Sequence, residues 1–506
     1  MFAKVKCFGL SGIEGFEVIV EADIHNALPG TDVVGLADTA IKEAKERVRS
    51  AIKNSGFYCP PRRITINLAP ADTKKEGPLF DLGMALAVLG AFEHAPASVI
   101  NSGAVFIGEL SLDGVLRPVR GMLPILISAV KKGFKTFVVP EENAAEASFI
   151  KEAEVYALKN LREAVQFLHT PHYFTRVRPR DFSSEVQYQY KDDFKYIRGQ
   201  AFARRAMEVA AAGNHNILLI GPPGSGKTML AKCLPSILPD LSAEEARETT
   251  KIHSVAGLLP PGVGMVTTRP LRAPHHTASQ VAVTGGGSKA MPGEISLAHN
   301  GVLFLDELPE YPRSVLEVLR QPLENKSILV SRAARTVTYP ADFMLVSGMN
   351  PCPCGNAGSS AKECTCSPMQ VSKYLSKLSG PLLDRIDMHI EVDNVTYDDI
   401  KGEESEDSES IRARVNRARS LQSERYEGKG ITNNAGLDSE LMAIYCALDE
   451  KSELLLKKAF DRLGLSVRAY TRVLKVARTI ADLSGEEKIQ FSHVSEALSY
   501  RCMDRK

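Results

Sequence analysis

The sequence predicts a multi-domain α/β protein that ends in a helical domain. Three observations support this fold class. Residues 1–168 alternate short β-like runs with helical runs, as α/β domains do. A glycine-rich loop at 221–226 lies between a short apolar run and a helical run, which is the strand–loop–helix order of a second α/β unit. From residue 411 onward, five successive segments have apolar residues at helical spacing.

The composition is that of an ordinary globular protein. Of the 506 residues, 44% are apolar and 24% charged, which excludes a fully disordered, collagen-like or coiled-coil chain. The 62 basic and 61 acidic side chains give a formal net charge of +1, so any binding of nucleic acid must depend on local patches. No apolar run approaches the roughly 18 residues of a membrane helix. The first residues show no signal-peptide pattern. We therefore expect a cytoplasmic protein without a membrane partner.

The first domain contains clear strand and helix patterns. Apolar runs rich in β-branched residues predict strands at 17–22 and 63–68. Between them, residues 39–53 carry apolar side chains at spacings of 3, 4 and 4, which predicts an amphipathic helix. Residues 80–92 predict a more buried helix, and 136–140 predict another strand. The alternation favours one α/β domain.

The rest of the chain divides at two segments of unusual composition. Residues 169–196 are rich in Pro, Arg, Tyr and Ser and predict a linker before a second α/β domain at 197–395. The acidic, serine-containing stretch at 396–410 predicts a second, solvated linker. Residues 411–506 then form a small helical domain. Its helices are expected at 411–426, 438–448, 453–463, 467–483 and 491–502.

The strongest functional signal is a complete phosphate-binding loop. The consensus is a glycine, four residues, then Gly-Lys-Ser/Thr. The chain matches it at Gly221, Pro222, Pro223, Gly224, Ser225, Gly226, Lys227 and Thr228. The glycines let backbone N–H groups turn inward around a phosphate. Lys227 is then placed to reach the β- and γ-phosphates of ATP, and the Thr228 hydroxyl to bind Mg²⁺.

Two later strands supply the remaining groups that ATP hydrolysis needs. Residues 301–305 are an apolar run that ends in Asp306 and Glu307, at the carboxyl edge where open α/β sheets bind ligands. We expect Asp306 to hold Mg²⁺ and Glu307 to act as the general base on the attacking water. A third apolar run, 343–347, leads to Asn350, which could orient that water.

With these motifs the sequence resembles the AAA+ ATPases, and most closely the magnesium-chelatase-like ATPases of the YifB/ComM family. The resemblance covers essentially all 506 residues. Its landmarks, besides the phosphate loop, are the stretches at 67–72, 75–78, 272–277, 292–299, 350–355 and 379–387. It implies an AAA+ core followed by a helical lid, with ATP and Mg²⁺ as cofactors.

The resemblance also implies roles for residues outside the phosphate loop. Arg385 matches the arginine finger, which acts on ATP held by a neighbouring subunit, and Arg468 matches the sensor-2 arginine of the lid. Gln200, in Gly199-Gln200, falls where the family contacts adenine. A finger that acts in trans requires a closed ring, so the resemblance implies a homo-hexamer.

Two insertions in the core are candidates for contacts with DNA. The first, 262–292, resembles the insertion in helix 2 of the chelatase branch and contains Lys289. The second, 328–339, has the pattern of a hairpin and contains Arg332 and Arg335. In that branch both insertions face a central channel, where cationic tips would follow a phosphate backbone. Exposed loops without a ligand are the alternative.

The first domain resembles the proteolytic domain of Lon proteases without its catalytic pair. Lon has its catalytic serine after a Lys-Asp-Gly-Pro run, whereas here the run 75–78 is followed by Leu79. At the place of the partner lysine the chain has Leu123. Leucine is neither a nucleophile nor a base, so we expect no peptidase activity.

Four of the nine cysteines lie in one short stretch. They form two Cys-x-Cys pairs, and the segment between the pairs is short and rich in small residues. The four are Cys352, Cys354, Cys364 and Cys366. Two pairs of thiolates could close a tetrahedral Zn²⁺ site, with free thiols or redox chemistry as alternatives. The adjacent His275 and His276 favour hydrogen bonding over metal binding.

Three functions remain open once ATP hydrolysis is accepted. The first is a hexameric DNA motor with helicase or branch-migration activity in DNA uptake and recombination, as in competence. The second is a chelatase-type regulator, although the chain has no D-x-S-x-S motif of an integrin-like metal-site domain. The third is a protein remodeller or unfoldase, although an aromatic pore motif is not evident.

Overall fold

The structure, a computed structural model, describes residues 2–96, 103–185, 190–287, 289–332, 335–358, 362–402 and 404–505. The chain forms two compact units. The first consists of 1–186 together with 243–267, and the second of 187–242 together with 268–506. Among the described residues, no helix has both the length and the apolar character that crossing a membrane requires.

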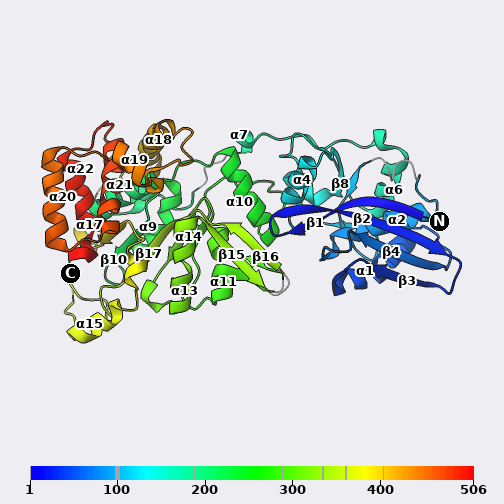
Figure 1. Ribbon diagram of the computed structural model, residues 1–506, viewed down its shortest axis with the longest axis horizontal. Coiled ribbons are helices and arrows are strands. Elements are labelled where there is room, and N and C mark those ends of the chain that lie inside the picture. Colours follow the sequence, from blue (N-terminus) through cyan, green and yellow to red (C-terminus); the bar gives the residue numbers. More distant parts are fainter. Residues whose placement is uncertain are drawn as a thin grey trace. The chain divides into compact units, whose positions relative to one another are not determined.

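Unit 1 contains a seven-stranded mixed sheet in the order β3-β4-β2-β1-β5-β8-β9 (Figure 1). β2 runs antiparallel to both β1 and β4, and the other neighbours in the sheet are parallel. The strands are β1 Phe2–Ser11, β2 Glu14–His25, β3 Gly30–Val34, β4 Arg63–Ala69, β5 Val105–Phe106, β8 Thr136–Pro140 and β9 Glu154–Leu158, with a small hairpin of β6 Glu109–Leu110 and β7 Leu116–Arg117.

The core of unit 1 lies between this sheet and its helices. The helices are α1 Thr39–Asn54, α2 Asp81–Ala91, α4 Met122–Lys131, α5 Ala144–Ala147, α6 Leu161–His169, α7 Phe182–Glu185 and α10 Ala243–Ala256. α1 begins where the Asp38 carboxylate accepts the N–H of Ile41 at 2.8 Å, which satisfies a free donor of the first turn. Every residue of α2 except Gly90 is buried, because α2 packs on β1 and β2 and against α1. The strands and helices expected at 17–22, 39–53, 63–68, 80–92 and 136–140 are confirmed.

Helix α10 is the unexpected member of unit 1. In sequence it lies inside the ATPase core expected at 197–395, yet it packs against α4 of the first domain. The Ser254 hydroxyl donates to the buried Glu146 carboxylate, and the Gly121 N–H donates to the Ser254 carbonyl at 3.2 Å. The first domain therefore includes residues 243–267, which the expected boundary at 168 leaves out.

Unit 2 is built on a five-stranded parallel sheet in the order β11-β14-β17-β10-β18. Its strands are β10 Ile217–Ile220, β11 Leu271–Arg272, β14 Val302–Leu305, β17 Met344–Met349 and β18 Met388–Glu391. Two antiparallel pairs lie outside the sheet, β12 Gly285–Gly286 with β13 Met291–Pro292 and β15 Ser327–Arg332 with β16 Arg335–Pro340. The β15–β16 pair confirms the hairpin expected at 328–339.

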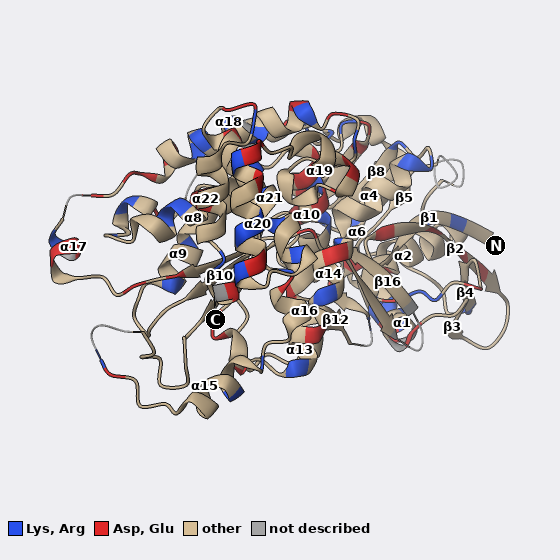
Figure 2. Ribbon diagram, turned by 60° about the vertical axis from the view of Figure 1, so that its left-hand side comes forward, with Lys and Arg blue, Asp and Glu red and all other residues tan. Residues whose placement is uncertain are grey.

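The helices of unit 2 surround this sheet and form the C-terminal domain. Those of the core are α8 Ala201–Gly213, α9 Lys227–Cys233, α11 Gln280–Thr284, α12 Glu294–Leu297, α13 Arg313–Val318, α14 Arg320–Asn325, α15 Pro368–Leu375 and α16 Gly380–Leu383. They are followed by α17 Tyr397–Lys401, α18 Ser408–Arg425, α19 Ser439–Tyr445, α20 Glu450–Leu463, α21 Val467–Leu483 and α22 Phe491–Ser499. The ribbon colours of Figure 2 show basic and acidic residues interspersed along α18 and α20.

The acidic stretch expected as a linker at 396–410 is largely structured. It contains α17, and the Asp407 side chain accepts the N–H of Ser410 at 2.8 Å as the cap of α18. Glu406 pairs with Arg414 of the same helix. Acidic residues are favourable at the positive end of a helix, so this stretch begins a helix instead of remaining a loose connection.

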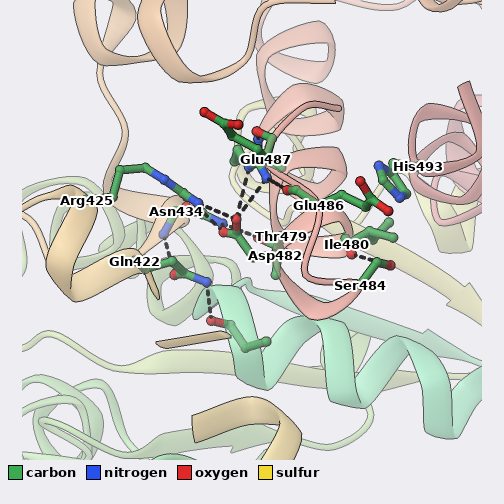
Figure 3. A network of polar contacts seen from close by, with 12 residues as sticks. Gln422, Arg425, Asn434, Thr479, Ile480, Asp482, Ser484, Glu486, Glu487 and His493 are labelled. Atoms are coloured by element: carbon green, nitrogen blue, oxygen red, sulfur yellow. Dashed lines mark hydrogen bonds and ion pairs between the residues drawn. The ribbon is translucent and has the colours of Figure 1, made fainter. Parts of the chain in front are cut away.

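A buried polar network joins α18 and α21 of the C-terminal domain to α8 (Figure 3). The Asp482 carboxylate accepts hydrogen bonds from Arg425 at 2.6 and 3.0 Å, from Arg478 at 3.1 Å and from Asn434 at 2.8 Å. Gln422 donates to the carbonyl of Ala212, the penultimate residue of α8, at 3.1 Å. Because these groups are buried and mutually bonded, they fix how the C-terminal helices dock on the core.

Candidate functional site

The phosphate loop follows β10, whose four residues are all buried. Gly224 and Gly226 adopt φ values of +81° and +87°, which side-chain-bearing residues rarely adopt. A Cβ atom at Gly221 would come within 2.2 Å of the Val392 carbonyl oxygen. Glycine is therefore needed at these positions for two reasons, backbone conformation and close approach to the neighbouring strand.

Lys227 lies inside the loop that it follows. Its Nζ donates to the carbonyl oxygens of Gly221 and Pro222, both at 2.8 Å, and lies 3.4 Å from Oδ1 of Asn350. Burial lowers the pKa of the Lys227 ammonium, and the carboxylates of Asp306 and Glu307 oppose that shift. The lysine is thus held where a phosphate would take over its bonds, and the Asn350 side chain lies beside it.

The Mg²⁺ candidates Thr228 and Asp306 are in direct contact. The Thr228 hydroxyl donates to Oδ2 of Asp306 at 2.8 Å. Asp306 directly follows β14, which lies next to β17 in the parallel sheet, so its carboxylate lies at the carboxyl edge of the sheet beside the loop. A hydroxyl and a carboxylate oxygen at this spacing are ligands that suit Mg²⁺, so these two residues fit the ion.

Glu307 is held by a histidine that the sequence pattern did not single out for this purpose. Its Oε2 lies 3.1 Å from Nδ1 of His276, and its backbone has a φ of +52°. The neighbouring His275 hydrogen-bonds the Thr277 hydroxyl at 2.8 Å. The histidine pair therefore hydrogen-bonds as expected. The contact of His276 with Glu307 could not be predicted, because the sequence shows only that two histidines are adjacent.

Gln200 also reaches the phosphate loop. It caps α8 with a φ of +51°, and its Nε2 donates to the carbonyl of Ser225 and, at 3.3 Å, to that of Asp393. The side chain therefore joins the loop to the segment after β18. This placement agrees with a position at the edge of a nucleotide site.

The two predicted arginines lie elsewhere in unit 2. Arg385 is buried, pairs with Glu324 and donates to the Pro381 carbonyl at 2.6 Å. Its own carbonyl accepts a bond at 3.2 Å from Asn216, which precedes β10. Asn216 precedes β10, whereas the phosphate loop follows β10. Arg385 therefore lies at the edge of the sheet where the strands begin, opposite the phosphate loop of its own chain. Arg468 is exposed in the first turn of α21, and its side chain has no hydrogen bond or ion pair with another described residue.

The four predicted cysteines come together. Their Sγ atoms all lie within 4.8 Å of one another, and none is in a disulfide. Backbone N–H groups of Asn356 and Thr365 donate to Cys354 and lower the pKa of its thiol to about 5. Four cysteine sulfurs this close together are a ligand set that suits Zn²⁺, so the cluster can bind Zn²⁺.

The predicted DNA contacts are described only in part. Lys289 is exposed on the turn between β12 and β13. Arg332 and Arg335 face each other across the end of the β15–β16 hairpin, and their side chains lie outside the described part of the structure.

The positions where Lon has its catalytic pair are apolar and buried in unit 1. Leu79 is 8% exposed and Leu123 is 1% exposed. The backbone N–H of Leu123 donates to the buried Glu146 carboxylate at 2.6 Å. Both leucines belong to the hydrophobic core, so they have a packing role at these positions.

Comparison with known proteins places the whole chain in one family. Three family descriptions match in succession: "Subunit ChlI of Mg-chelatase" over 20–143, "Magnesium chelatase, subunit ChlI" over 193–400, and its C-terminal region over 405–501. The competence protein ComM of Haemophilus influenzae is 44% identical over 500 residues, which is 98% of this chain and 96% of that protein. The chain belongs to the ComM/YifB branch of the magnesium chelatase ChlI family.

Other members of the ComM/YifB branch match equally completely. The YifB protein of Escherichia coli (strain K12) is 42% identical over 98% of this chain and 96% of its own length. The Rv2897c protein of Mycobacterium tuberculosis is 41% identical over 97% and 96%. Lon protease 2 of Bacillus subtilis is 28% identical over 125 residues, which is 24% of this chain and 22% of that protein. This ComM/YifB protein is a magnesium-chelatase-like AAA+ ATPase with a Lon-like first domain.

Proposed function

We propose that this ComM/YifB protein is a hexameric ATP-driven motor that acts on DNA, with helicase or branch-migration activity during DNA uptake and recombination. The observation that carries the ATPase part is the contact set at one sheet edge, in which Thr228 bonds Asp306 and Lys227 approaches Asn350. The competence name of the Haemophilus influenzae relative supports the DNA part.

Each residue of the proposed site has a distinct task. The loop 221–226 and Lys227 bind the phosphates of ATP, and Gln200 borders the nucleotide. Mg²⁺, when bound through Thr228 and Asp306, supplies charge that offsets the build-up of negative charge on the phosphates. Glu307 takes a proton from the attacking water once His276 releases it, and Asn350 orients that water.

Arg385 would complete the site of a neighbouring subunit. Its place at the opposite edge of the sheet from its own loop suits action in trans, and a head-to-tail contact that closes gives a ring. To act, the guanidinium must leave its ion pair with Glu324 and bind the γ-phosphate of ATP held by the neighbouring subunit. Its planar fork then binds charge that develops during phosphoryl transfer. Arg468 would contact the bound nucleotide from α21, so that the position of the C-terminal helices depends on which nucleotide is bound.

The DNA contact is proposed for the two insertions. Changing Arg335 to Ala should weaken DNA binding and flatten its dependence on salt, since each lost phosphate contact removes counterion release. Lys289→Ala should act in the same direction. Binding measured by fluorescence anisotropy between low and physiological salt checks this expectation, and an unchanged salt slope would contradict it.

The test of the motor is the ATPase rate with single-stranded, duplex and forked DNA. Stimulation by DNA that disappears in Glu307→Gln would support the motor and rank its substrates. The ChlI family name favours a second candidate, a chelatase-type regulator that remodels a protein partner. An ATPase rate that is indifferent to every DNA at hexamer-forming concentration would favour that remodelling role.

A further inference from the structure

The four-cysteine cluster begins in the sequence directly after a residue of the nucleotide site. Asn350 directly follows β17, and Cys352 comes two residues later. The sixteen residues 351–366, here called the cysteine knuckle, contain all four thiols and end just before α15. A predicted water-orienting residue and a metal ligand are thus separated by a single proline.

The spacing of the sulfur atoms fits one tetrahedral metal ion. Cys352 lies 3.4 Å from Cys354 and 3.6 Å from Cys364, and Cys354 lies 3.6 Å from Cys364. Four ligands at about 2.3 Å from Zn²⁺ place their sulfurs about 3.8 Å apart. A disulfide would require about 2.05 Å. The backbone N–H of Ala357 also donates to the Cys352 sulfur at 3.3 Å.

The cysteine knuckle contacts the phosphate loop itself. A Cβ atom at Gly355 would come within 2.6 Å of Cδ of Pro223 and within 3.9 Å of the Asn350 side chain. Gly355 also has a φ of +81°. Cys352 is fully buried. The backbone of the knuckle at Gly355 is therefore packed against the loop that would surround the phosphates.

Both ends of the cysteine knuckle converge on Asn350. At its start, the Asn350 side chain approaches Lys227 at 3.4 Å. After its end, Tyr374 of α15 is buried, and its hydroxyl accepts the backbone N–H of Asn350. Whatever orders the knuckle therefore acts on Asn350 through the main chain that joins Asn350 to Cys352.

We propose that Zn²⁺ bound by Cys352, Cys354, Cys364 and Cys366 is a structural part of the nucleotide site, which positions Asn350 and Pro223 so that the site distinguishes ATP from ADP. The proposal rests on the ATPase function proposed above. The metal would close the loop between the two cysteine pairs and so remove conformational freedom next to the proposed γ-phosphate position. Because ligand effects between two sites are reciprocal, bound ATP should also tighten the hold on Zn²⁺.

The first experiment measures metal content and nucleotide affinity together. Purified full-length protein should contain one Zn²⁺ per chain by mass spectrometry of the elements, and the double variant Cys364→Ser/Cys366→Ser should contain none. Cys59→Ser, which removes a thiol of unit 1 outside the cluster, is the matched control. Titration calorimetry with Mg²⁺ present should show about tenfold weaker binding of ATPγS in the double variant, within the usual range for coupled sites. Binding of ADP should stay within about twofold, because Asn350 faces the γ-phosphate.

Two further variants separate positioning from a general structural role. In an Asn350→Ala background, adding the cysteine changes should not lower the ratio of ATPγS to ADP affinity any further, since both act through Asn350. Gly355→Ala should keep its Zn²⁺ and still lose the preference for ATPγS, because its Cβ would collide with Pro223. This second variant serves as the test if the cysteine variant does not fold.

Three results would overturn the proposal. One is wild-type protein that holds no Zn²⁺ and takes none up from added zinc salt. Another is a double variant that weakens ATPγS and ADP equally, and the last is an additive effect in the Asn350→Ala background. If wild-type protein binds nucleotides but does not hydrolyse ATP, the proposed function fails, while the affinity ratio still decides the role of the metal.

Discussion

The buried carboxylate of Asp482 offers a quantitative test of how the C-terminal helices are held. Replacing it with alanine removes the shared partner of Arg425 and Arg478 (Figure 3). Arg478 is 2% exposed and cannot turn to solvent, because its other N–H groups donate to the carbonyls of Glu486 and Glu487 at 2.6 and 2.7 Å. The variant would therefore leave a buried guanidinium without a counter-charge.

The expected cost follows from that uncompensated charge. Removing one partner of a buried ion pair destabilises a protein by about 3–5 kcal/mol. A change of about 1.36 kcal/mol alters an equilibrium constant tenfold. This cost therefore makes the locally open state of the C-terminal helices about 150- to 5,000-fold more populated. Since whole domains are stable by only about 5–15 kcal/mol, the change is large for this region.

The assay uses the thiol of Cys446, which is buried at the end of α19 and 4% exposed. Its labelling rate under native conditions, followed by peptide mass spectrometry, reports the local opening of these helices. Asp461→Ala, at an exposed position of α20, is the control and should change the rate by less than about twofold. A rise of less than about tenfold for Asp482→Ala would refute the reasoning, because the network would then contribute little.

Three further outcomes are expected. Glu307→Gln should keep ATP binding and reduce the steady-state ATPase rate about 10²- to 10⁴-fold; an undiminished rate would remove Glu307 from the role of base. Arg385→Ala should be inactive alone and recover activity when mixed with inactive Glu307→Gln subunits, whereas a mixture without recovery would argue against action in trans. Burial lowers the pKa of His389 to about 3, so the folded chain keeps it neutral while the unfolded chain protonates it below about pH 6.5. Stability should therefore fall with decreasing pH in that window, by up to about 1.36 kcal/mol per pH unit from this group. His389→Phe should reduce the slope of stability against pH, measured from urea midpoints, by the contribution of one proton. A slope equal to that of the wild-type protein would contradict the assignment of this effect to His389.

The sequence allowed the local parts of the nucleotide site to be predicted. The phosphate loop, Asp306 and Asn350 each follow a short apolar strand, and parallel strands bring their carboxyl ends to one edge. The bonds Thr228–Asp306 and Lys227–Asn350 confirm that these residues meet. The four cysteines also assemble as their paired spacing suggested. The roles of Arg385, Arg468 and the two insertions stay predictions.

Long-range packing was not predictable from the same patterns. Residues 243–256 lie in sequence inside the expected ATPase core, and no local pattern says which domain buries them; here they pack against α4 of unit 1. Charge density suggested a solvated linker before α18, although Asp407 caps that helix and Glu406 pairs with Arg414. The contact of Gly355 with Pro223 joins segments more than 130 residues apart, which no local signal reveals.

The insertion of 243–267 into unit 1 also affects the order in which the chain can fold during synthesis. When residue 186 has been made, Glu146 still lacks the Ser254 hydroxyl and the surface of α4 that α10 covers is open. The ribosome must add another 81 residues, 187 to 267, before unit 1 can close. At about 5–20 residues per second this takes about 4–16 s. The phosphate loop and α9 are synthesised within that interval, so this first part of the ATPase core is made before the amino-terminal domain is complete. A gene fragment cut at residue 186 would encode a domain that never receives its last helix.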